Sequence, residues 1–335
     1  MGTPARANST GRDDSTWAQT RFMIVRVARG FFRASGADAA AGLTFYAVLA
    51  GFPAIIAAFS LIGMLGRKQD VVGDVLDAGK EVLPPDVIAA ISEPVERAAA
   101  TAGGGWVLFL SLLLALWSVA RYVTALGRAI NRAYGVLEGR VLWKMKPSQL
   151  LVTLLVFVLV WVAGLLSALS WPAAQSLGHA MGAGEVTLMI WRIARWPVVV
   201  LVVVLVVAIL YYFAPNIQHA HFRLVSIGAV VAILLFAAAS AGFGFYVANL
   251  ADYDRVYGSF AGIVIFLVWL WIGNIALVIG AHLDAELERI RELRRGIPAE
   301  RDLQVQMRDT ERLERNAEND RRDEQRARRF RRSRR

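Results

Sequence analysis

Apolar residues in this chain gather in six long blocks, separated by stretches that hold most of the charged residues. The clearest block, residues 149–171, reads QLLVTLLVFVLVWVAGLLSALSW and contains no charged side chain. Because a bilayer core about 30 Å thick needs roughly 20 apolar residues per helix, blocks of this length are typical of membrane spans. The pattern predicts an all-α membrane protein with a bundle of six transmembrane helices, at 40–65, 105–126, 149–171, 189–213, 224–248 and 258–282.

The first predicted span contains the stretch GLTFYAVLAGFP, residues 42–53, in which small and polar residues replace plain leucines. Small side chains let helices approach closely, and we assign that role to Gly42, Ala47, Ala50 and Gly51. Thr44 is expected to bond a preceding carbonyl, and Pro53 to kink the helix. The hydroxyl of Tyr46 is expected to need a polar partner within the bilayer.

Two further prolines suggest breaks in the helices. In the fourth block Arg192 and Arg195 come just before Pro197, which is therefore an alternative start for that span. Pro215 follows the same block. Tyr211 and Tyr212 at its end are interpreted as interfacial anchors.

Charge differs strongly between the loops. The loop after the second span is basic, and the loop after the first span carries seven acids. The basic residues are Arg121, Arg128, Arg132, Arg140, Lys144 and Lys146, and the acids are Asp70, Asp74, Asp77, Glu81, Asp86, Glu93 and Glu96. Since basic loops stay in the cytoplasm, six spans place both termini there.

The regions outside the spans define three predicted parts: a cytoplasmic arm at 1–36, the transmembrane domain at 37–283 and a charged tail at 284–335. Residues 66–104 form an external helical loop, broken at Pro84 and Pro85. The arm contains an interfacial amphipathic helix over 17–33. Its arginines, Arg26, Arg29 and Arg33, face anionic headgroups at the membrane surface, while its apolar face carries Trp17, Ile24, Val27 and Phe31.

The long helix after the sixth span is expected to end at Gly296, and Pro298 to start a new segment. The chain finishes RARRFRRSRR, with seven arginines in ten residues. We interpret this end as a flexible polybasic tail on anionic lipid, with topology retention and RNA binding as alternatives.

Composition excludes several kinds of chemistry. The chain is 56% hydrophobic and has no cysteine, so thiol chemistry, iron–sulfur clusters and cysteine-based zinc sites are excluded. Its four histidines include the pair His219 and His221, but no further His or Asp cluster accompanies that pair to complete a metal site. No nucleotide-binding or hydrolase motif is present. The sequence therefore predicts no enzyme, no cofactor, no metal and no specific nucleic acid partner.

Four ordered motifs resemble one known family. They are AAGLTFYAVLAGFP, LWSVARYVTALGRAINRAYG, YYFAPN and FGFYVANLADYDRVYGSFAGIVIFLVWLWIGNIALVIGAHLDAELE. Over about residues 20–295 the chain resembles the YihY/BrkB family of bacterial inner-membrane proteins, once mislabelled as ribonuclease BN. The resemblance implies six helices, cytoplasmic termini and a link to envelope integrity and virulence, with transport of a lipid-like substrate as a suggested activity. The matching positions are Tyr46, Phe52, Pro53, Asn131, Arg132, Tyr134, Gly135, Pro215, Asn216, Tyr253, Tyr257, Gly258, Ser259, Trp269, Gly280 and Glu286.

The chain departs from the family pattern at three positions. His282 stands where the family usually has an acidic residue, Asp284 where it has Asn or a similar polar residue, and Ala50 where it often has Ser. If the acid is mechanistic in relatives, His282 would make this protein depend on pH.

The sequence and the resemblance leave two alternative functions, a transporter and a scaffold. The first is a transporter or flippase-like protein for a lipid or amphiphile, with membrane lipids, above all anionic headgroups, as partners. Its candidate substrate path comprises Tyr46, Pro53, Arg121, Arg132, Asn216 and Asn274. The second is a non-catalytic envelope scaffold that recruits partners through the external loop and basic tail. A ribonuclease rests on the old family label alone. The sequence leaves homo-oligomerisation open.

Overall fold

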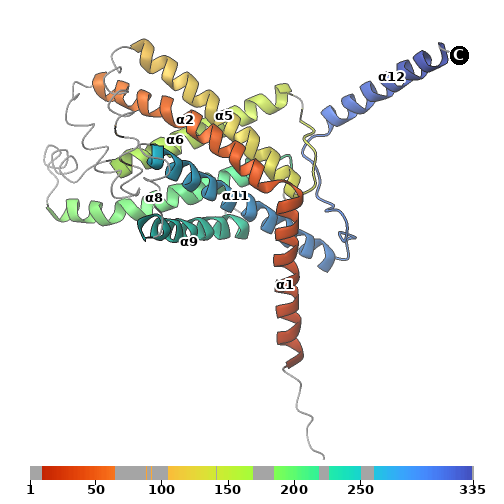
Figure 1. Ribbon diagram of the computed structural model, residues 1–335, viewed down its shortest axis with the longest axis horizontal. Coiled ribbons are helices and arrows are strands. Elements are labelled where there is room, and N and C mark those ends of the chain that lie inside the picture. Colours follow the sequence, from red (N-terminus) through yellow and green to blue (C-terminus); the bar gives the residue numbers. More distant parts are fainter. Residues whose placement is uncertain are drawn as a thin grey trace, which may run out of the picture.

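Six helices form a bundle in which α6 and α8 cross the direction of α2, α5 and α11 (Figure 1). They are α2 (Gly36–Met64), α5 (Gly105–Ala133), α6 (Leu142–Ala168), α8 (Glu185–Phe213), α9 (Ile227–Asn249) and α11 (Ala261–Arg294). Two more helices, α1 (Thr10–Arg33) and α12 (Glu311–Ser333), lie outside this bundle. The computed structural model describes residues 10–64, 88, 92, 105–140, 142–168, 185–218, 226–249 and 260–333. The predicted external loop 66–104 falls almost entirely outside the described residues.

The all-helical membrane fold is confirmed. Among the residues that the structure describes, five helices are long and apolar enough to cross a membrane, namely those over Gly36–Ala57, Gly105–Ala133, Ile193–Phe213, Ile227–Val247 and Ala261–Arg294. The apolar part described for α6, Gln149–Gly164, is shorter, so the sixth span stays a prediction. Large apolar side chains cover the outside of the bundle. Leu151 is 69% exposed and Leu201 64%, which suits a surface that faces lipid.

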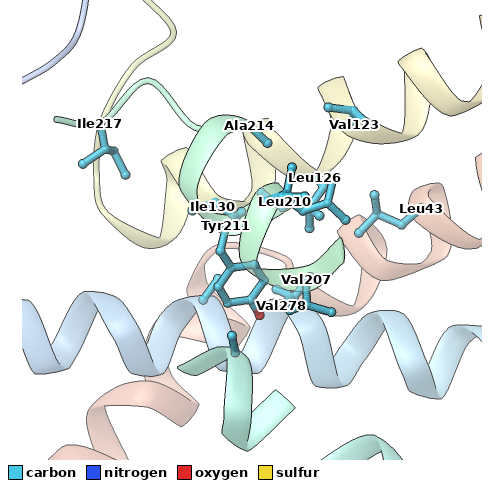
Figure 2. Packing of buried hydrophobic residues seen from close by; sticks show 14 of the residues in the cluster. Leu43, Val123, Leu126, Ile130, Val207, Leu210, Tyr211, Ala214, Ile217 and Val278 are labelled. Carbon is cyan, nitrogen blue, oxygen red and sulfur yellow. The ribbon is translucent and has the colours of Figure 1, made fainter. Parts of the chain in front are cut away.

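The core lies where α5, α8 and α11 meet (Figure 2). Leu126 and Ile130 of α5 pack there with Leu210 of α8 and Val278 of α11. Tyr211 belongs to this core, which corrects its interpretation as an interfacial anchor. It is 6% exposed, and its hydroxyl donates a hydrogen bond to the carbonyl oxygen of Leu277. Its position in sequence, at the end of a span, did not show that α8 crosses α11 there.

Helices α9 and α11 approach each other closely through their backbones. A Cβ added at Gly228 would lie 2.1 Å from the carbonyl oxygen of Gly280, and one added at Gly280 would lie 2.4 Å from that of Gly228. By contrast, a Cβ at Gly42 or Gly51 would meet nothing within 4 Å. The assignment of these two glycines to close helix contacts was therefore wrong, because the residues face away from the neighbouring helices.

Helices α2 and α8 continue through their prolines. Pro53 lies inside α2 and Pro197 inside α8, so neither ends its helix, and Pro197 is not the start of α8. Proline removes only one backbone donor, and membrane helices tolerate that loss when neighbouring groups satisfy the freed carbonyl. Of the three expected breaks, only the one at Pro215 coincides with a helix end, since α8 stops at Phe213.

Helix α1 packs against α11 at one end of the bundle (Figure 1). Val27 and Phe31 are buried there, and Arg26 forms an ion pair with Glu286 at 2.8 Å. Ile24, which the sequence placed on the same apolar face, is 61% exposed. Part of that face thus contacts protein, and a location of α1 at the membrane surface stays a prediction.

Two glycines with positive φ follow helices, and the sequence predicted the helix end at one of them, Gly296. Gly135 (φ 69°) follows α5 and Gly296 (φ 77°) follows α11. In each case the next amide donates back across the turn, from Val136 to Asn131 at 2.8 Å and from Ile297 to Glu292 at 3.0 Å. This pattern favours glycine because the left-handed conformation disfavours a Cβ.

The chain after α11 returns to the bundle. Ala299 is fully buried, Gln218 donates its amide to Gln306, and Ile217 pairs with Met307. Only beyond this segment does α12 project away from the other helices (Figure 1). The predicted tail therefore includes a packed segment over 299–310 and a helix over Glu311–Ser333.

Candidate functional site

A hydrogen-bonded group of three polar side chains lies inside the apolar bundle. The side-chain amide of Asn274 in α11 donates to the hydroxyl of Thr44 in α2 at 3.1 Å. The hydroxyl of Tyr122 in α5 donates to the side-chain carbonyl oxygen of Asn274 at 2.8 Å. Asn274 also donates to the backbone of Leu270, and Thr44 to that of Ala40. All three helices meet at this group, which we call the Thr44–Tyr122–Asn274 network. Asn274 is thus a hydrogen-bonding group inside the bundle.

Arg121 lies next to this network but points outward. It is exposed, and its guanidinium carbon lies 5.8 Å from the ring centroid of Tyr46 and 5.7 Å from that of Trp117. The ring of Tyr46 thus makes a cation–π contact with Arg121, in addition to an edge contact with Phe45. Arg121 and Tyr46, both candidates for the substrate path, come together across the α2–α5 interface.

Asn216 lies in a different place, at the end of the bundle near α1 and the returning tail. It is fully buried, and its backbone N–H donates a hydrogen bond to the side-chain oxygen of Asn131 at 2.8 Å. Its side chain donates to the carbonyl oxygen of Asp309 at 2.9 Å and accepts from the amide of the same residue. Through these hydrogen bonds Asn216 joins the loop after α8 to the returning tail. Because its side chain is fully buried, it cannot contact lipid.

Asn131, Glu138, Arg140, Asn216 and Arg308 make up this structure, which we call the loop junction. Arg140 is 6% exposed and donates to both oxygens of Glu138, at 2.8 and 2.9 Å, and to the carbonyl oxygen of Ala214. Burial alone would raise the pKa of Glu138, but the hydrogen bonds and charge of Arg140, together with a bond from Asn131, lower that pKa below its ordinary value.

Arg308 closes the loop junction from the tail. It donates to the carbonyl oxygens of Ile217 and Tyr212 at 2.7 and 2.6 Å. Burial and the neighbouring charge of Arg140 lower the pKa of Arg308 from its ordinary value. The junction thus joins the loops after α5, α8 and α11 through charged groups that have polar partners.

The remaining predicted path residues are not brought together. Pro53 is partly buried inside α2, and Arg132 is exposed in the last turn of α5. None of the contacts described above joins Pro53, Arg132 or Asn216 to the Thr44–Tyr122–Asn274 network.

His282 belongs to α11 and faces α1. It is 4% exposed, its ring is in edge contact with Phe31, and a Cβ on Gly30 would lie 3.1 Å from its Nδ1. The departure from the family pattern at this position therefore sits in the contact between the N-terminal helix and the bundle.

Sequence reasoning missed Tyr122, Arg140 and Arg308. Tyr122 carried a usable signal, since a hydroxyl within a span needs a partner for the same reason as that of Tyr46. Arg140 and Arg308 gave none, because a basic residue in a loop is ordinarily exposed. Their burial depends on the returning tail.

No group of three or more potential metal ligands occurs among the residues that the structure describes. His219 and His221 lie outside those residues, as do Tyr253, Tyr257, Gly258 and Ser259.

Comparison with known proteins agrees with this architecture. Residues 27–304 match the family described as virulence factor BrkB. The ribonuclease-like protein YfkH of Bacillus subtilis is 28% identical over 77% of this chain and 92% of its own length. A UPF0761 membrane protein of Alkalilimnicola ehrlichii is 26% identical over 78% of this chain but 57% of its own length, so the chain spans little more than half of that relative. No solved structure matches. The chain belongs to the BrkB (YihY) family of membrane proteins.

Proposed function

We propose that this protein is a transporter or flippase-like protein that moves a lipid or amphiphile across the bacterial inner membrane, with both termini in the cytoplasm. A role in envelope integrity would follow from such an activity. Passive or gradient-coupled movement is the mechanism we favour, since the sequence has no nucleotide-hydrolysing motif.

The position of Arg121 is the observation that carries this proposal. It is exposed on α5, twelve residues before Ala133, which at about 1.5 Å per residue is roughly 18 Å from the end of the helix. A charged side chain at lipid depth is unfavourable by a few kcal/mol unless it meets water, a counter-charge or a headgroup. The aromatic rings of Tyr46 and Trp117 lie beside the guanidinium, and because the side chain is exposed, its N–H groups can reach a phosphate.

The neighbouring residue points the other way and supplies a polar route inward. Tyr122 connects α5 to Asn274 and Thr44, so polar groups lie behind Arg121 where α2, α5 and α11 meet. A small separation of these helices would expose the network to a headgroup held at Arg121. Arg121, Tyr46 and Asn274 are therefore the path residues that we retain.

Arg121→Gln is expected to slow lipid movement at least tenfold, because losing a charge-assisted contact of about 1.5–3 kcal/mol reduces a rate or affinity by that order. The measurement is loss of fluorescence from a labelled phospholipid in liposomes containing the full-length protein, after a membrane-impermeant quencher is added. Arg329→Gln removes the same charge from the exposed face of α12 and serves as the control. Wild-type protein that moves no more lipid than empty vesicles would refute the proposal.

A scaffold function remains the alternative, and α12 favours it. This helix is charged along its length, exposed, and projects from the bundle (Figure 1). Intrahelical ion pairs such as Glu311–Arg315 and Glu318–Arg322 stabilise it. Such a helix offers a surface to a partner.

Deleting residues 317–335 separates the two functions. The deletion keeps the packed segment 299–310 and the first turn of α12, so the bundle is expected to fold as before. If the protein is a transporter, lipid movement and the envelope phenotype should both survive. A scaffold would lose the phenotype while wild-type and shortened proteins show equal lipid movement, measured side by side in cells and liposomes.

A further inference from the structure

A pocket of about 290 Å³ lies beside the loop junction. The last turns of α5, the loop after it and the start of α12 form its wall. Its lining residues are Thr124, Arg128, Leu137, Glu138, Arg312, Leu313 and Asn316. Neither Arg121 nor any residue of the Thr44–Tyr122–Asn274 network lines it.

The tail segment holds this pocket in shape. The amide of Arg312 donates to the carbonyl oxygen of Gly139 at 2.9 Å, and Asn216 bonds both Leu137 and Asp309. At Gly139 an added Cβ would lie 2.0 Å from the carbonyl oxygen of Asp309, so the two segments touch through their backbones. The start of α12 is therefore fixed against the loop after α5.

Two arginines bring uncompensated positive charge to this wall. Arg128 and Arg312 are both exposed, and neither forms an ion pair within the part of the chain that the structure describes. The carboxylate that they border, Glu138, already receives Arg140 on both oxygens and Asn131 on one. Because that charge is matched by Arg140, Arg128 and Arg312 remain available to an anion.

The other lining groups suit a phosphate that carries an organic substituent. Asn316 offers an amide, while Leu137, 66% exposed, and Leu313 offer apolar contact beside the arginines. A volume near 300 Å³ is at the lower limit for ligand pockets. It favours a phosphate monoester or a single headgroup over a nucleotide. The guanidinium group of an arginine can donate two parallel hydrogen bonds to two oxygens of one phosphate.

We propose that this pocket binds a phosphate-bearing group, either a phospholipid headgroup or a free phosphate ester, through Arg128 and Arg312. The inference goes beyond the proposed transport, because binding here requires no movement of lipid. Arg312 also lies outside the family match, which ends at residue 304. The pocket therefore includes a part of this chain that the family match does not cover.

The test uses full-length protein in a phosphate-free, nonionic detergent. Glycerol 3-phosphate is titrated in by calorimetry, and dioleoylphosphatidylglycerol is added for native mass spectrometry. The variant Arg128→Gln/Arg312→Gln is expected to lose at least tenfold in affinity for whichever probe binds the wild type. Arg321→Gln/Arg329→Gln removes the same charge from the exposed part of α12 and is expected to bind like the wild type. Arg128→Lys/Arg312→Lys keeps the charge without the fork and should bind at an intermediate level.

Each outcome has a defined meaning. Binding of both probes identifies the phosphate ester itself as the ligand, and binding of the lipid alone identifies a membrane headgroup. No binding of either probe, or an equal loss in the Arg321/Arg329 variant, overturns the proposal. A failure of the protein to move lipid in liposomes would refute the proposed transport but not this binding proposal, because the titration measures equilibrium binding. All four arginines are exposed, and equal gel-filtration profiles check that the variants remain folded.

Discussion

Gly280→Ala is expected to destabilise the bundle by about 1–3 kcal/mol or more, the usual effect of overpacking a filled interface. The added Cβ would lie 2.4 Å from the carbonyl oxygen of Gly228, 2.7 Å from the hydroxyl of Tyr211 and 2.8 Å from the Cβ of Ala232. The nearest of these atoms belongs to backbone, so α9 and α11 must separate. Heat-induced unfolding in detergent, followed by tryptophan fluorescence, measures the loss as a lower midpoint.

Gly242→Ala is the matched control for this substitution. Gly242 lies in α9, and a Cβ there would meet nothing within 4 Å. Alanine favours a helix over glycine by up to about 1 kcal/mol, so this variant should be as stable as the wild type or slightly more so. If Gly280→Ala and Gly242→Ala behave alike, then α9 and α11 do not approach as closely as the structure shows.

Arg140→Met is expected to lower the free energy of unfolding by about 3–5 kcal/mol, because it leaves the partly buried carboxylate of Glu138 without its arginine partner. The side chains of Arg140 and Glu138 are only 7% and 17% exposed. Adding Glu138→Gln to the same variant should restore part of the stability, since the unpaired charge is then removed. Chemical unfolding of the two variants and of the wild type measures both effects.

The pH dependence of this ion pair has a defined sign. The pKa of Glu138 is lowered below its ordinary value of 4.5, so the pair contributes stability above about pH 4.5 and loses it as pH falls through the lower folded-state pKa. Without Arg140, burial raises that pKa, and acid should then stabilise the variant.

Arg315→Met provides the comparison for this ion pair. It removes an ion pair with Glu311 in which the arginine is 58% exposed, and it should cost no more than about 1 kcal/mol. Equal losses for Arg140→Met and Arg315→Met would show that Arg140 is not buried in the loop junction.

The residues of the loop junction and Arg121 have different roles. Asn131, Gly135 and Asn216 match the family pattern, and the structure gives each a role in ending or joining loops. A match to a family motif therefore did not separate positions that maintain the fold from positions that meet a ligand. Arg121 is the clearer functional candidate, because it is a charge exposed on a span-length helix, in contact with two aromatic rings.

Much of the fold could be predicted from the sequence. The block at 105–126 became α5 (Gly105–Ala133), and the block at 224–248 became α9 (Ile227–Asn249). The turns at Gly135 and Gly296, and the bond from Thr44 to a carbonyl in its own helix, follow from the same local rules. Hydrophobic length and turn chemistry are properties of neighbouring residues, so a single chain reveals them.

The tertiary structure alone decided which polar groups meet. Tyr122 and Asn274 are 152 residues apart, Asn274 and Thr44 are 230 apart, and Arg26 and Glu286 are 260 apart. Nearly uniform apolar helices carry little periodic signal for the face that each turns toward its neighbours. Packing of whole helices sets those faces, and so it placed Tyr211 in the core, left Gly42 and Gly51 without close neighbours, and brought the tail back to bury Asn216 and Arg140. The sequence by itself determined a helical membrane protein of this family, and the long-range contacts between its helices determined where charge is buried and where it stays free to bind.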